Sequence, residues 1–284
     1  MVILVTGALG QLGQSLQFIA REYPDDQFLF ASSQDLDITN FNQVHSFFEK
    51  NKIDFCINTA AYTAVDKAET ESEKAYQINV TGPKNLAIAC QKYRATLIHI
   101  STDFVFDGTN LNPYKEDDLT NPIGVYGQTK LEGEKEVISN CKNHFIIRTS
   151  WVYSEFGNNF MKTMLRLAQD RDELNVVADQ IGTPTNAVDL AKAILQIITF
   201  STHHSPSNNY GIYNFSNEGK CSWYDFAEEI FKVNNISIKV NPIPTAAYPT
   251  PAKRPKYSVL DKSKIKVTFG LQIKTWKDSL HKII

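Results

Sequence analysis

The chain opens with MVILVTGALGQLGQSLQ (residues 1–17), and this stretch decides the fold that we expect. An apolar run over residues 2–5 stops at three glycines, Gly7, Gly10 and Gly13, each three positions after the last. Apolar side chains then recur at helical spacing, so the pattern predicts a buried strand, a glycine turn and a helix. Such a turn presents backbone N–H groups and the positive end of a helix dipole to an anion.

The spacing of the glycines is G-x-x-G-x-x-G, one residue longer than the G-x-G-x-x-G of dinucleotide-binding turns. A tight turn that binds nothing is the alternative, but the strand and helix around it favour a dinucleotide. The choice between NADH and NADPH stays open, because residues 30–40 carry neither an acidic residue at the strand end nor an arginine. Asp37 in this loop could reach an adenine amino group, or it could be a plain loop aspartate or cap the following helix.

Strand-like and helical segments alternate through the first 150 residues. This alternation predicts an α/β fold with a doubly wound, Rossmann-like parallel sheet covered on both faces. The predicted strands cover residues 2–5, 27–32, 54–60, 96–102 and 144–150, and the predicted helices residues 11–23, 40–51, 72–93 and 126–141.

After Ser150 the alternation loosens. We expect helices over 158–170, 186–200 and 222–234, a strand over 210–216 and a short final helix in 275–284, while the proline-rich stretch 241–255 should break regular structure. The predicted organisation is a dinucleotide-binding domain over 1–150 and a smaller mixed substrate lobe mainly over 151–284. A segment of about 180–217 is expected to return to the first domain.

Composition narrows the class of protein. The 284 residues carry a net charge of −2 with dispersed basic residues, so no nucleic-acid partner is expected. No stretch approaches the roughly 18 apolar residues of a membrane span. The four cysteines lie far apart without a C-x-x-C pair, which favours a cytoplasmic location. The histidines lack metal-ligand spacing, so no metal site is expected.

Tyr126 and Lys130 form the one Y-x-x-x-K pattern of the chain, four residues apart on a predicted helix face. An ammonium near a phenol favours the phenolate, so we expect Lys130 to lower the pKa of Tyr126 and make it a general acid. Ser101 and Thr102 end the preceding predicted strand, where a hydroxyl can hold a substrate oxygen or the phenol. The alternative for Thr102 is a hydroxyl that bonds its own backbone.

Six motifs together resemble the extended short-chain dehydrogenases/reductases, from residue 2 to about residue 260. Two of them, AAYTAVDKAE (60–69) and STDFVFDG (101–108), are typical of the branch that reduces dTDP-4-keto-6-deoxy sugars. The other four are TGALGQLG (6–13), YGQTKLEGE (126–134), RTSWVY (148–153) and DQIGTPT (179–185).

The resemblance implies reduction of the 4-keto group of dTDP-6-deoxy-L-lyxo-4-hexulose to dTDP-L-rhamnose by NADH or NADPH. It implies catalytic roles for Thr102, Tyr126 and Lys130, in which Tyr126 protonates the C4 oxygen and Lys130 also holds the nicotinamide ribose. The implied cofactor contacts, besides Tyr126 and Lys130, are Gly7, Gly10, Gln11, Leu12 and Gly13 at the pyrophosphate, Asp37 and Ile38 at the adenine, and Ala60, Ala61 and Thr63 after the third strand.

For the substrate, the resemblance implies contacts by Asp103 and Trp151 beside Thr102 and Tyr126, and by Arg254 near the diphosphate. Trp151 could instead be a core residue, and Arg254 could be part of a solvated basic loop.

Two departures from the family pattern are visible. Tyr257 stands where the family usually has asparagine, and Ser15 stands where some members carry a glutamate of a magnesium-bridged dimer. A monomer or weak homodimer is therefore expected. The alternatives are another nucleotide-sugar reductase or epimerase, or a non-catalytic regulatory subunit of the same fold.

Overall fold

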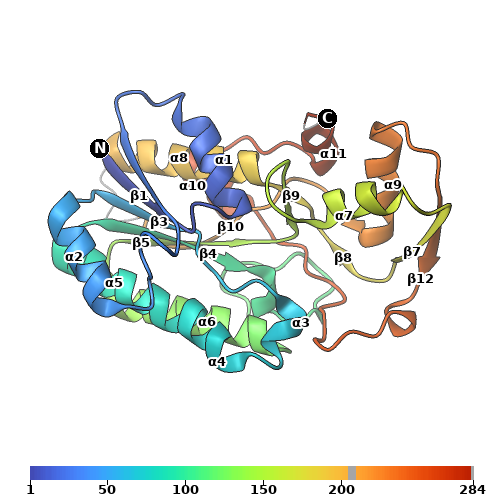
Figure 1. The fold of residues 1–284 in the computed structure, drawn as a ribbon, viewed down its shortest axis with the longest axis horizontal. Coiled ribbons are helices and arrows are strands. Elements are labelled where there is room, and N and C mark those ends of the chain that lie inside the picture. Colours follow the sequence, from blue (N-terminus) through green and yellow to red (C-terminus); the bar gives the residue numbers. More distant parts are fainter. Residues whose placement is uncertain (204–208, 283–284) are drawn as a thin grey trace.

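Six parallel strands form the central sheet of the protein, in the order β10-β5-β4-β3-β1-β2 (Figure 1). The structure is a computed structural model that describes residues 1–203 and 209–282. The two innermost strands, β4 and β3, are almost wholly buried, as strands covered on both faces must be. The predicted doubly wound sheet is confirmed. Its strands are β1 (Val2–Thr6), β2 (Gln27–Ala31), β3 (Phe55–Asn58), β4 (Thr96–Thr102), β5 (His144–Thr149) and β10 (Gly211–Asn214).

Helices cover both faces of this sheet (Figure 1). Successive side chains of a strand point to opposite faces, so Ile3 and Val5 lie in one hydrophobic core and Leu4 lies in the other. The first core is closed by α1 (Gln11–Ala20), α8 (Ala187–His203) and α10 (Ser263–Phe269), and the second by α2 (Phe41–Asn51), α5 (Gly82–Tyr93) and α6 (Val125–Asn140).

The helix predicted over 72–93 is interrupted. It consists of α4 (Ser72–Tyr76), a π-helical turn (Gln77–Thr81) and α5. Within the turn, the Asn79 amide accepts a hydrogen bond from the Tyr62 backbone N–H (2.9 Å) and donates to the Thr129 hydroxyl (3.1 Å). The turn therefore ties the chain after β3 to α6. A short helix in that connection, α3 (Val65–Ala68), was not predicted.

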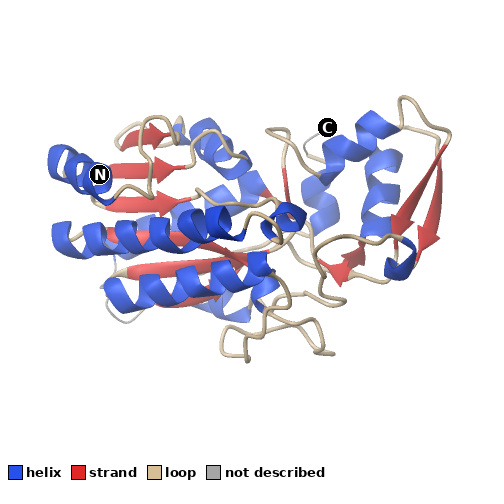
Figure 2. Ribbon diagram, turned by 60° about the horizontal axis from the view of Figure 1, so that its bottom comes forward, coloured by secondary structure: helices blue, strands red, loops and turns tan. Residues whose placement is uncertain are grey.

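A second lobe lies beyond the carboxyl ends of the sheet strands (Figure 2). Its core is aromatic, with Tyr153, Phe226 and Trp276 buried together. The elements of this lobe are β6 (Val152–Tyr153), α7 (Phe160–Leu167), β7 (Glu173–Val177), β8 (Ile181–Gly182), β9 (Thr185–Asn186), β11 (Cys221–Ser222), α9 (Trp223–Val233), β12 (Lys239–Ile243) and α11 (Trp276–Leu280).

The expectation that the whole proline-rich stretch is irregular is wrong at its start. Pro242 lies within β12 and is paired in register with Val176 of β7. A two-stranded sheet leaves each strand with an open edge, where a residue without an N–H group is tolerated. The final helix, α11, is shorter than predicted, and Ile283 and Ile284 lie outside the described residues.

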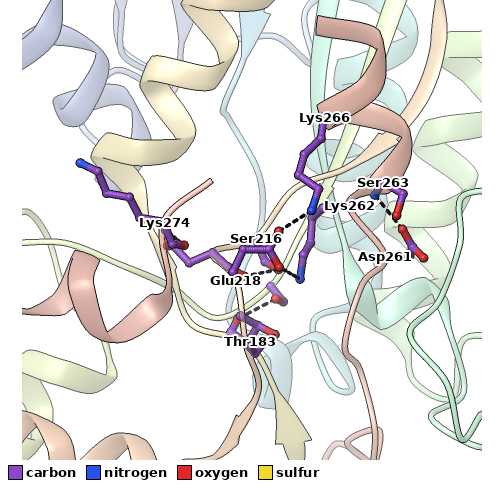
Figure 3. Close-up of polar contacts among 11 residues, drawn as sticks. Thr183, Ser216, Glu218, Asp261, Lys262, Ser263, Lys266 and Lys274 are labelled. Carbon is purple, nitrogen blue, oxygen red and sulfur yellow. Dashed lines mark hydrogen bonds and ion pairs between the residues drawn. The ribbon is translucent and has the colours of Figure 1, made fainter. Parts of the chain in front are cut away.

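Polar contacts near the lobe junction centre on Glu218, which follows β10 (Figure 3). Its carboxylate pairs with Lys266 Nζ at 2.8 Å and with the buried Lys262 Nζ at 3.5 Å, while its backbone N–H donates to the Lys274 carbonyl at 2.8 Å. Strand β10 and helix α8 lie with the first sheet, but the domain boundaries themselves stay a prediction. In the part of the chain that the structure describes, no helix has the length and apolarity to cross a membrane.

Candidate active site

The glycine turn joins β1 to α1 in the predicted way. Gly7 has φ +69°, and a Cβ atom there would lie 2.6 Å from the Ala60 backbone N. A Cβ atom on Gly13 would lie 2.5 Å from the Gly7 carbonyl oxygen. Gly10 is the N-cap of α1 and supplies no side-chain acceptor, so the first N–H groups of the helix stay available to an anion. These residues fit a dinucleotide pyrophosphate.

The side chain of Gln11 connects the turn to the second lobe. Its Oε1 atom accepts hydrogen bonds from Asn159 Nδ2 (2.9 Å) and Ser154 Oγ (3.3 Å). The loop between β6 and α7 therefore lies against the start of α1. The sequence analysis assigned Gln11 to the pyrophosphate and missed this side-chain contact, because its partners are more than 140 positions away along the chain. Leu12 is buried in the core next to the sheet.

The predicted adenine residues follow β2. Asp37 is exposed, and its carboxylate accepts hydrogen bonds from the Thr39 N–H (2.9 Å) and hydroxyl (2.7 Å). The N-cap of α2 is Asn40, so the alternative that Asp37 caps this helix is wrong. Ile38 is buried against Gly82. The remaining cofactor residues, Ala60, Ala61 and Thr63, follow β3 at the same sheet edge, and their roles stay predictions.

Thr102, Tyr126 and Lys130 meet at the carboxyl end of β4. The Thr102 hydroxyl lies near enough to the Tyr126 phenol to lower its pKa. Lys130, buried one helical turn later, donates from Nζ to the Ile100 carbonyl at 2.6 Å. Helix α6 approaches the turn after β4 closely: a Cβ atom on Gly127 would lie 2.2 Å from the Phe104 carbonyl oxygen. This close packing brings the three predicted catalytic residues together.

The expected lowering of the Tyr126 pKa is wrong for this structure. Burial of the phenol raises its pKa to about 12; the nearby Thr102 hydroxyl opposes the rise, and the negative charge of Asp103 adds to it. Burial lowers the pKa of Lys130 to about 8, against the attraction of Glu134. Desolvation thus sets the direction of the Tyr126 shift, and the Lys130 ammonium is not among its causes. The phenol is protonated at neutral pH, which is the state that a proton donor requires.

Asp103 lies beside these groups with a carboxylate that is only partly satisfied. The residue is buried, and Oδ1 accepts a hydrogen bond from the Thr102 hydroxyl at 3.1 Å. Among the described residues, Oδ2 has no partner at hydrogen-bonding distance, although the Ser258 hydroxyl is near enough to exert a pKa-lowering effect. Burial dominates and raises the pKa of Asp103 to about 6. Within the described part of the chain, this oxygen is therefore a buried acceptor without a partner, which costs stability.

The other predicted substrate residues have protein partners. The Trp151 ring stacks on the Trp223 ring of α9, with the ring centroids 3.5 Å apart. On that face Trp151 packs as a core residue. The Arg254 guanidinium donates two hydrogen bonds to the Asp66 carboxylate, at 3.0 and 2.8 Å, so it neutralises a protein group here. Tyr257 packs beside the small cluster around Phe106. Sugar and diphosphate contacts by Trp151 and Arg254 stay predictions.

Within residues 1–203 and 209–282, no group of three or more His, Cys, Asp or Glu side chains could hold a metal ion.

The family model of the RmlD substrate binding domain matches residues 1–284, the whole chain. The chain belongs to this family. A family relative from Aggregatibacter actinomycetemcomitans, named dTDP-4-dehydrorhamnose reductase, is 45% identical over 288 residues, which cover 99% of this chain and 97% of the relative.

Two solved structures of relatives have the same fold over nearly their whole length. The dTDP-4-dehydrorhamnose reductase from Clostridium acetobutylicum is 47% identical, with a TM-score of 0.95 over 100% of this chain and 98% of that one. The one from Bacillus anthracis, solved in complex with NADP, is 40% identical, with a TM-score of 0.94 over 99% of this chain and 98% of that one.

Proposed function

We propose that this chain is a dTDP-4-dehydrorhamnose reductase, which reduces the 4-keto group of dTDP-6-deoxy-L-lyxo-4-hexulose to give dTDP-L-rhamnose with NADPH or NADH. The observation that carries the proposal is the meeting of Thr102, Tyr126 and Lys130 at the end of β4. Ligands of open α/β sheets bind at this edge. The names of the full-length relatives support the same reaction.

The residues of the glycine turn would hold the cofactor. The N–H groups of Gln11 and Leu12, at the uncapped start of α1, would bind the pyrophosphate. Lys130 would hold the nicotinamide ribose. When bound, the nicotinamide supplies the hydride that goes to C4 of the sugar.

Side chains of this protein supply the proton and orient the groups between which it is transferred. Tyr126 donates its phenolic proton to the C4 oxygen, which would otherwise become an alkoxide. Thr102 is placed to hydrogen-bond the same oxygen and orient the carbonyl. The Lys130 ammonium stabilises the phenolate that Tyr126 becomes, and the free Oδ2 of Asp103 accepts a hydrogen bond from a sugar hydroxyl. Because its pKa is high, Tyr126 is protonated before each turnover and can donate its proton.

The proposed setting of this reaction is the cytoplasm, with the enzyme acting as a monomer or weak homodimer. The substrate is the dTDP-linked 4-keto-6-deoxy sugar, and neither a nucleic acid nor a membrane is a proposed partner.

Oxidation of NADPH or NADH in the presence of a dTDP-4-keto-6-deoxy sugar generated in situ tests the proposal. We expect cofactor consumption in proportion to the sugar, with other 4-keto nucleotide sugars consumed at least tenfold more slowly. A protein that binds NADPH but consumes it with none of these sugars would be a regulatory subunit, and the proposal would be lost.

A further inference from the structure

We propose that Glu134 is a positioning residue of this site, which fixes α6 on the ends of β4 and β5 and supplies a buried carboxylate one helical turn from the Lys130 ammonium. The inference rests on the proposed function, because it names a residue on which Lys130 of the proposed active site depends. Glu134 was not among the residues that the sequence singled out. Its signal is its place four residues after Lys130, on the same helical face.

Residues of two neighbouring strands donate hydrogen bonds to the Glu134 carboxylate. Its side chain is 1% exposed and that of Arg148, on β5, is 3% exposed. Arg148 donates from Nε to Oε1 at 3.0 Å and from Nη2 to Oε2 at 2.7 Å. The Ser101 hydroxyl of β4 donates to Oε1 as well. A buried bidentate pair of this kind fixes geometry strongly, since removing one partner leaves the other charge unpaired.

Three consecutive residues of β4 are thereby tied to three residues at successive turns of α6. The Thr102 hydroxyl meets Tyr126, the Ile100 carbonyl meets Lys130, and the Ser101 hydroxyl meets Glu134. The first two contacts belong to the catalytic groups. The third holds the same helix to the same strand, so Glu134 controls where the other two side chains stand.

The charge of Glu134 also acts on Lys130. Lys130 is 2% exposed, and burial lowers its pKa to about 8, while Glu134 raises it. The other ionisable groups around Lys130 do not replace this anion. Arg148 is cationic, and burial keeps the pKa of His99, on β4, well below its usual value, so that His99 is neutral. Tyr126 is a neutral phenol at physiological pH. Asp103 is the other nearby carboxyl group, and it lies beside the phenol.

The direct test is the titration of Lys130 without any cofactor. Lysine labelled with 13C at Cε is followed by NMR from pH 6 to 11, and the Lys130 signal is assigned through Lys130→Met. In Glu134→Gln, which keeps the shape and loses the charge, we expect the pKa of Lys130 to fall by about one unit or more. Glu136→Gln is the matched control, because it removes the same charge from the exposed side of α6 and should leave Lys130 unchanged.

A second measurement tests how the Lys130 pKa affects the binding of NADPH. NADPH should bind Glu134→Gln as tightly as the unmodified protein at pH 6 and about fivefold more weakly at pH 8, where Lys130 is about half protonated in the unmodified protein and about one-tenth protonated in the variant. Should Glu134→Gln not fold, the double variant with Arg148→Met removes the unpaired arginine and should still lower the pKa of Lys130. Ser101→Ala retains the carboxylate and should not change this pKa.

An unchanged Lys130 pKa in a folded protein without the Glu134 charge, or an equal shift in Glu136→Gln, would overturn the inference. Because the titration needs neither sugar nor turnover, it is independent of the outcome of the reductase assay. A protein inactive on every sugar whose Lys130 still depends on Glu134 would defeat the proposed function alone.

Discussion

Thr102, Tyr126 and Lys130 meet because of features that individual residues display in the sequence. A strand end and a four-residue spacing on a helix were enough to predict that they lie together. The direction of the Tyr126 pKa shift was not predictable in this way. It depends on the burial of the phenol, whose ring packs edge-on against Phe104, and no local pattern reveals that burial.

Asp103→Asn should stabilise the protein at neutral pH. The pKa of Asp103 is raised from 3.8 to about 6, so folding favours its protonated form and the ionised form costs stability. The cost is absent below about pH 4, grows as the pH rises, and reaches about 3 kcal/mol above pH 6. The free energy of unfolding in urea is compared for Asp103→Asn and the unmodified protein between pH 4 and 8. The extra stability of the variant should vanish at pH 4.

Asp107→Asn is a control for which the opposite change in stability is expected. Hydrogen bonds, first from Thr109, lower the pKa of Asp107 to about 2, so its ionised form stabilises the fold above pH 4. This variant should be the less stable protein at neutral pH, with a deficit that shrinks as the pH falls from 4 toward 2. A stability difference for Asp103→Asn that does not change with pH would refute the account of the buried carboxylate.

At the scale of the elements, the strands and helices of the main sheet follow from hydrophobic periodicity and were predicted. The pair of β7 and β12 was not, because each is a short edge strand whose partner residues lie 66 positions away. The π-helical turn was missed for a similar reason. It is held by hydrogen bonds from Asn79 to Tyr62 and Thr129, and such tertiary contacts leave no trace in the periodicity of a helix.

The glycine turn supplies a prediction at this scale. Gly7 and Gly270 have nearly the same backbone angle, φ +69° and +66°, but a Cβ atom on Gly7 would strike the backbone of Ala60, whereas Gly270 has nothing within 4 Å. Gly270→Ala should cost about 1–2 kcal/mol for the left-handed conformation alone. Gly7→Ala should cost clearly more in urea unfolding and also abolish NADPH binding. Equal costs, with binding retained, would show that the close approach to β3 is unimportant.

At the scale of the whole molecule, the sequence predicted a sheet domain followed by a smaller lobe, but not how the two are joined. The contact of Gln11 with Asn159 spans 148 positions and that of Arg254 with Asp66 spans 188. Only the folded chain brings such partners together. The match of one family model to the whole chain agrees with the resemblance that six dispersed motifs indicated.

The central claim is that Tyr126 delivers the proton that completes reduction of the sugar carbonyl. The most direct measurement is kcat for the dTDP-4-keto-6-deoxy sugar, together with the dissociation constant of NADPH, in Tyr126→Phe, which keeps the ring that packs edge-on against Phe104. The account predicts that kcat falls by about 100-fold or more while NADPH binding changes less than about threefold. A variant that keeps most of its kcat, or loses activity only by binding NADPH poorly, would contradict it.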